Sequence, residues 1–178
     1  MKRPSVREVR SFLQGKTQEE LINDILFFYG KFEGVKEFIS LQMGAEFSDD
    51  LIEKYRAIIQ REFFPARGYG KIRLSIARKA ITDYKKISPN IPGLVELMVF
   101  YVEMGVRFTR EYGDIHEQFY TSMESMYEDA IKYIIQYKLQ GKYQQRCKAI
   151  VEDTRGMGWW FHDTLSDIYF EAFTEEDD

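Results

Sequence analysis

The fold is decided by residues 94–140, which read LVELMVFYVEMGVRFTREYGDIHEQFYTSMESMYEDAIKYIIQYKLQ. On each side of Gly113, apolar residues recur at steps of three and four, the spacing that places them along one face of a helix. Before the glycine they are Leu94, Met98, Tyr101, Gly105, Phe108 and Tyr112, and after it Ile115, Phe119, Met123, Met126, Ala130, Ile134 and Tyr137. Gly113 can end the first helix and Asp114 can cap the second. The stretch therefore predicts an antiparallel helical hairpin.

A second apolar row lies beside the first row in the first helix of this hairpin, at Val95, Val99, Val102 and Val106. A helix that is apolar over so much of its circumference is usually covered on several sides. We therefore expect this helix to lie at the centre of the protein.

Shorter helical patterns lie on both sides of the hairpin. Capping boxes are predicted at two helix starts, Ser5 with Glu8 and Thr17 with Glu20. Helix stops are predicted at Gly15, Gly30, Gly44 and Pro65, and a further helix start at Ser48. Further helices are expected from Ile72 to Tyr84, beyond Gly141, and from Trp160 to Phe173.

No segment alternates apolar and polar residues between turn markers, so no strand is predicted. We predict an all-α fold of eight or nine helices, a stack of antiparallel helical hairpins that resembles superhelical repeat proteins with a degenerate period. The stack is expected to form one domain over residues 1–174, followed by an acidic tail at residues 175–178.

The composition of the sequence and its apolar runs limit the classes of protein to which it can belong. The 178 residues are 44% apolar and 16% aromatic, enough to bury a core without disulfides. Cys147 is the only cysteine, which favours a reducing compartment. Residues 1–12 lack the apolar core of a signal peptide, and no uncharged apolar run approaches the roughly 20 residues that span a bilayer. We expect a soluble, cytoplasmic protein with no membrane contact; the sequence gives no oligomeric state.

The sequence offers one weak candidate for catalysis. His162 and Asp163 adjoin, and Asp167 lies one helical turn further on. Metal-dependent phosphohydrolases use such a His–Asp doublet, together with a separate upstream histidine and a downstream aspartate. Here His116 is the only other histidine, so the set of ligands is incomplete. A metal-assisted hydrolase is therefore kept only as an alternative. We expect instead that His162 bonds a partner near a helix start, where Asp163 is favoured by the helix dipole.

No metal and no cofactor are expected. Glu117, Glu124 and Glu128 lack the Glu-x-x-His pairs of di-iron sites and should form a solvated acidic face. The glycines before Lys71 do not fit a phosphate loop. The glycines at 156 and 158 do not fit a dinucleotide fingerprint.

A basic segment, residues 61–86, suggests nucleic-acid binding as a second alternative. Its candidate contacts are cations interleaved with aromatic residues, namely Arg67, Lys71, Arg78, Lys79, Lys85 and Lys86. The net charge of the whole chain is -4, which argues against a dedicated nucleic-acid binder.

The leading hypothesis is a non-enzymatic interaction module that holds a segment of another protein in a groove between helices. Stacked helices present long concave faces, and the sequence contains no complete catalytic constellation. Residues of the types that dominate binding hot spots lie near the predicted turns, at Arg107, Arg110, Tyr112, Arg155, Trp159 and Trp160.

Four phrases, in this order, resemble a family of small bacterial, all-helical proteins whose domain has no known function. They are VREVRSFLQGKTQEELINDILFFYGKF, EFFPARGYGKIRLSIARKAITDYKKISP, FYVEMGVRFTREYGDIHEQFYTSMESMYEDAIKYI and RCKAIVEDTRGMGWWFHDTLSDIYFEAF. The resemblance covers nearly the whole chain. It implies family membership, but no catalytic residue, substrate or cofactor.

Overall fold

A computed structural model describes residues 3–43 and 49–173. The expected helix ends at Gly44 and Ser48 and the tail at residues 175–178 lie outside the described residues. The chain divides into two compact units, residues 1–46 and 47–178. The single domain expected over residues 1–174 stays a prediction, and each unit is described by itself.

The first unit contains three helices, α1 (Val6–Gln14), α2 (Gln18–Lys31) and α3 (Glu33–Gln42). Both predicted capping boxes are confirmed, since Ser5 and Thr17 each exchange hydrogen bonds with the glutamate three residues on. Gly15 ends α1 as predicted. The stop predicted at Gly30 is wrong, because the chain leaves the helical conformation only at Phe32, whose N–H still donates to the Phe28 carbonyl.

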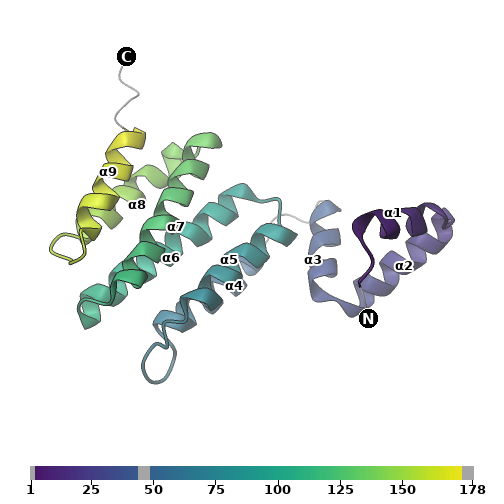
Figure 1. Ribbon diagram of the computed structural model, residues 1–178, viewed down its shortest axis with the longest axis horizontal. Coiled ribbons are helices and arrows are strands. Elements are labelled where there is room, and N and C mark those ends of the chain that lie inside the picture. Colours follow the sequence, from purple (N-terminus) through teal and green to yellow (C-terminus); the bar gives the residue numbers. More distant parts are fainter. Residues whose placement is uncertain (1–2, 44–48, 174–178) are drawn as a thin grey trace, which may run out of the picture. The chain divides into compact units, whose positions relative to one another are not determined.

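The second unit contains six helices, arranged as three hairpins (Figure 1). The hairpins are α4 (Asp49–Phe63) with α5 (Leu74–Ile87), α6 (Ile91–Tyr112) with α7 (Glu117–Gln136), and α8 (Gln140–Asp153) with α9 (Phe161–Phe173). Helix α4 ends before Pro65, as predicted. The described residues contain nine helices and no strand, which confirms the all-α prediction.

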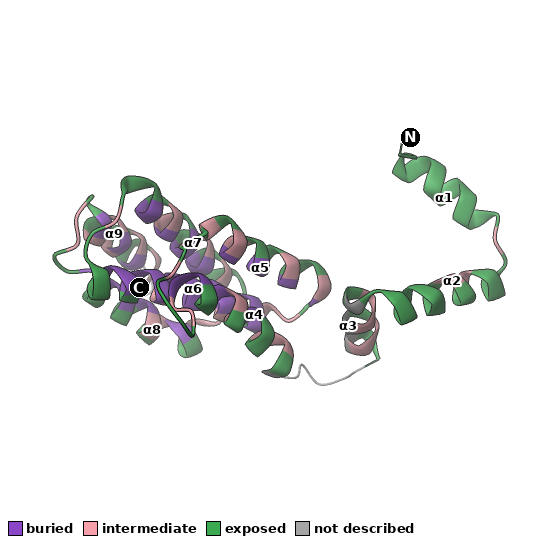
Figure 2. Cartoon of the chain, turned by 90° about the horizontal axis from the view of Figure 1, so that it is seen from below, coloured by how far each residue is buried: buried purple, intermediate pink, exposed green. Residues whose placement is uncertain are grey.

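Helix α6 is the central helix of the second unit, as its two apolar rows predict. It packs against α4, α5, α7 and α8, and all four valines of its second row are buried. Figure 2 shows the buried residues concentrated around α6. At Gly105 the approach of α7 is close, since a Cβ there would stand 2.2 Å from the Met123 sulfur. The core therefore depends on α6 being covered on nearly every side.

Two local predictions about loops are wrong. Asp114 does not cap α7, which begins after His116 without a side-chain cap, because the Asp114 carboxylate is bonded to other groups. Ile72 lies outside α5: its φ of 50° is left-handed, and its N–H donates to the Glu62 carbonyl. Gly113 ends α6 as expected, with a left-handed φ of 87° that favours glycine.

Candidate functional site

Three turns meet at one end of the second unit (Figure 1). They are the α4–α5 loop, residues 64–73, the α6–α7 turn, residues 113–116, and the α8–α9 turn, residues 154–160. We call this region the three-turn end. All six predicted anchor residues lie in it or in the last two turns of α6. The hairpin topology therefore gathers residues that are separated in the sequence.

Asp114 joins two of the three turns. One of its carboxylate oxygens accepts hydrogen bonds from the Tyr120 hydroxyl at 2.6 Å and from the Gly158 backbone N–H at 3.2 Å. These two bonds, the Tyr120 bond first, lower the pKa of Asp114 below its usual range. Gly158 leaves room for this contact, since a Cβ there would stand 2.9 Å from the other carboxylate oxygen. The α6–α7 turn thus holds the α8–α9 turn in place.

Trp159 and Trp160 follow this contact in a strained backbone conformation. Their φ angles are 62° and 57°, in the left-handed region that bulky residues rarely occupy. The Trp159 indole N–H donates to the Ile115 carbonyl at 3.1 Å, which anchors one ring. Trp160 is 81% exposed, and its side chain makes no hydrogen bond or ring contact with the part of the chain that the structure describes. Because such conformations cost of order 1–3 kcal/mol each, this exposed indole is presented at an energetic cost.

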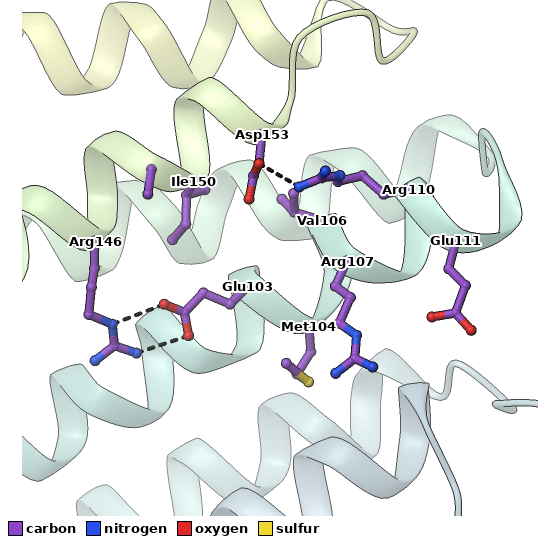
Figure 3. A pocket seen from close by; sticks show the side chains of 10 residues that line it. Glu103, Met104, Val106, Arg107, Arg110, Glu111, Arg146, Ile150 and Asp153 are labelled. Atoms are coloured by element: carbon purple, nitrogen blue, oxygen red, sulfur yellow. Dashed lines mark hydrogen bonds and ion pairs between the residues drawn. The ribbon is translucent and has the colours of Figure 1, made fainter.

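A groove runs along the exposed side of α6 beside α8, with a volume of about 600 Å³. Figure 3 shows its lining, in which Arg146 reaches Glu103 and Arg110 reaches Asp153. The buried residues Met104, Val106 and Ile150 form its apolar floor. A second hollow of about 440 Å³ shares Arg110 and Asp153 with the groove and extends to Asp114 and Met157. The two hollows are therefore neighbours, and the second is lined by Arg155, Gly156 and Met157 of the α8–α9 turn.

An ion-pair network fixes the far wall of the groove. Arg146 holds both carboxylate oxygens of Glu103 at 2.9 Å and donates to Glu96 at 2.6 Å, and Glu96 also pairs with Arg56. Burial would raise the pKa of Glu96, but the bond to Arg146 and the charges of Arg146 and Arg56 outweigh it and lower the pKa. Because these charged groups already pair with one another, they form part of the groove wall and are not available to bind a ligand.

Two of the predicted anchors carry guanidinium groups that no carboxylate of the described residues neutralises. Arg107 lies over the Phe64 ring at 4.5 Å, and Arg155 is exposed in the second hollow. Arg110, by contrast, is already paired with Asp153. Arg107 and Arg155 can therefore bind carboxylates from outside.

The α4–α5 loop and the end of α6 together carry an exposed aromatic pair. The Tyr69 and Tyr112 rings are 4.6 Å apart, and both contact Phe108. Tyr69 belongs to the α4–α5 loop, whereas Tyr112 is the last residue of α6. Glu62, which is buried, fastens the same loop by accepting two hydrogen bonds from the Arg73 guanidinium, at 2.9 and 2.8 Å.

The residues of the hydrolase alternative do not form a metal-binding group. His162 bonds the Thr154 hydroxyl at 2.9 Å and the Val151 carbonyl at 3.1 Å through the same ring nitrogen. Asp163 lies in the first turn of α9, and Asp167 and His116 are exposed. Within residues 3–43 and 49–173, no three His, Cys, Asp or Glu side chains are placed to hold a metal ion.

The cations of the basic segment do not share one free surface. Arg78 donates to the Ser122 carbonyl at 2.9 Å, and Lys79 and Lys86 both pair with Asp83. Lys85 lies over the Tyr133 ring at 5.2 Å. Of the six candidate cations, Arg67 and Lys71 belong to the α4–α5 loop, and the other four lie on α5.

The sequence predicted neither the hydrogen bond between Asp114 and Gly158 nor the ion pairs of Arg146. A glycine next to a tryptophan doublet marks an unusual turn, but the partner 44 residues away leaves no local signal. The spacing of Glu96 and Glu103, seven residues apart on α6, places both on one face and could have indicated a cationic partner.

Comparison with known proteins gives a family but no activity. The model of a family of unknown function, DUF6155, matches residues 4–174. No curated protein and no solved structure matches the chain. Within the described part of the chain, no helix combines the length and apolar character needed to cross a bilayer.

Proposed function

Because the chain belongs to this family, whose description assigns no activity, we propose from the surface alone that it is a cytoplasmic interaction module. In this proposal, the groove along α6 and the three-turn end hold an extended segment of another protein. The observation that carries the proposal is the α8–α9 turn, where a strained backbone presents the exposed Trp160 indole while Arg155 and Met157 of the same turn line the second hollow.

The lining of the groove indicates the chemistry of the segment. The floor of the groove is apolar, since the largely buried Met104 and Ile150 line it, and Arg107 and Arg155 offer guanidinium groups without acidic partners among the described residues. A segment that carries apolar side chains and at least one carboxylate fits both features. The hydrolase and nucleic-acid alternatives stay predictions, since no arrangement of the described residues favours either.

The test begins by finding the partner at the proposed surface. A photo-crosslinking amino acid at position 160 should capture one protein, whereas the same probe at Lys132, on α7, should not. Capture from both positions, or from neither, would contradict the proposal.

The captured segment can then be titrated with the purified chain. Trp159 and Trp160 are the only tryptophans, so tryptophan fluorescence reports on this turn alone. We expect the bound segment to shield these indoles from a soluble quencher. Trp160→Ala and Arg107→Ala should each weaken binding about tenfold or more, equal to about 1.4 kcal/mol, while Lys132→Ala should not. Equal affinity of all four proteins would refute the groove as the binding site.

A further inference from the structure

The first unit has an apolar surface that it does not cover itself. Neither α1 nor α2 contains a buried residue (Figure 2). On α1, Val6 and Phe12 are 81% and 65% exposed, and they lie on one stripe with Val9 and Leu13. On α2 and just after it, seven large apolar side chains are exposed, namely Ile22, Ile25, Leu26, Phe27, Phe28, Tyr29 and Phe32. Such an extensive apolar surface marks a contact site.

The length of α1 shows that this surface must be covered. Helices shorter than about 12–15 residues are marginal in water, and in proteins they are stabilised by packing an amphipathic face. Helix α1 has nine residues and a complete capping box, but no buried side chain. Among the described residues, Lys16 links α1 to α2, since it pairs with Asp24 and lies 5.1 Å from the centre of the Phe12 ring. These contacts position α1 without burying its stripe.

Helices α1 and α2 of the first unit carry net charges of opposite sign. Residues 3–14 contain three arginines and one glutamate, a net charge of +2. Helix α2 contains three acidic residues and one lysine, a net charge of -2. A surface that offers a basic amphipathic helix and an acidic one can pair with a copy of itself about a two-fold axis. The acids of α2 would be repelled by an anionic membrane, which disfavours that surface as the partner.

We infer that the first unit is a homodimerisation element, in which α1 of one chain packs against α2 of a second copy and the reverse. In each copy the apolar stripe of α1 and exposed apolar side chains of α2 are then buried, and arginines of α1 face acids of α2. This assignment uses different residues from the groove of the second unit, so either can fail without the other.

The first test is the oligomeric state of the full chain by sedimentation over a concentration series. We expect a dimer. Phe12→Asp should raise the dimer dissociation constant at least tenfold, whereas Ser11→Asp, which adds the same charge at the neighbouring position off the stripe, should leave it nearly unchanged. Circular dichroism checks that both variants keep their helices. A chain that is monomeric at all concentrations, or a dimer that persists in Phe12→Asp, would overturn the inference.

A charge exchange tests which helices pair. One variant carries Arg7→Glu and Arg10→Glu, and the other carries Glu19→Lys and Asn23→Lys, which leaves both capping boxes and the Lys16–Asp24 pair intact. Each variant alone should be monomeric, because α1 and α2 then have the same sign. Mixed together, they should form a heterodimer. A mixture that stays monomeric would refute the α1–α2 pairing, and a monomeric wild-type chain that binds anionic phospholipid vesicles would assign the stripe to membranes instead.

Discussion

The carboxylate of Asp114 accepts a hydrogen bond from the backbone N–H of Gly158 at 3.2 Å, across a separation of 44 residues. This contact connects the central hairpin to the turn that carries Trp159 and Trp160. The same oxygen also accepts a hydrogen bond from the Tyr120 hydroxyl, so this carboxylate, together with the Trp159 indole that donates to the Ile115 carbonyl, positions the turn.

Replacing Asp114 by alanine should therefore destabilise the protein. Both hydrogen bonds to the carboxylate are lost, and we expect a decrease in the free energy of unfolding of about 1 kcal/mol, because water reaches this exposed site and replaces part of the loss. Urea denaturation measures the change. Asp167→Ala, which removes an exposed aspartate without a hydrogen bond or ion pair to residues 3–43 or 49–173, is the control and should change the midpoint little.

A methyl group at position 158 should disturb the same contact from the other side. In Gly158→Ala the new Cβ would overlap the Asp114 carboxylate, and we expect a loss of about 1 kcal/mol and a changed tryptophan emission. Gly141→Ala is the matched control, since a Cβ there meets nothing within 4 Å and alanine favours the helix. If both variants were equally stable, the close approach at Gly158 would not be a constraint.

Glu96 should make the stability depend on pH. Its pKa is lowered in the folded chain, so its contribution is fully present above the unfolded value of about 4.3 and is lost as the pH falls through the folded value. Glu96→Gln should cost about 2 kcal/mol at pH 7, because Arg56 loses its partner on α6 and Arg146 keeps only Glu103. Urea midpoints at pH 7 and pH 3 should differ less for Glu96→Gln than for the wild type. Equal pH dependence would show that the network contributes nothing to stability.

The thiol of Cys147 should be inert in the folded protein. Burial raises its pKa to about 12, so almost no thiolate forms at pH 8 and reagents cannot reach the sulfur. We expect labelling by a thiol-reactive disulfide to be slower by about a hundredfold or more than in urea. Rapid labelling without denaturant would indicate that α8 detaches readily.

Local patterns predicted the elements of the fold well, because a helix depends on residues three and four apart. The two rows of α6 predicted both its length and its central position, and the capping boxes of α1 and α2 stand where their spacing placed them. The errors at Asp114 and Ile72 have one cause: in each case a partner outside the local pattern competed successfully for the group. Tyr120 and Gly158 took the carboxylate of Asp114, and the Glu62 carbonyl took the N–H of Ile72.

The candidate site was predicted as a set of residue types, but not as an arrangement. Arginine, tyrosine and tryptophan near turns could be recognised in the sequence, whereas the sequence could not distinguish Arg110, which Asp153 neutralises, from Arg107, which stays unpaired among the described residues. The sequence by itself determined the helices, their hairpin order and the central position of α6, because these follow from local periodicity and short connections. Only the tertiary structure decided which charges are satisfied and which turns meet, because those depend on distances between residues far apart in the chain.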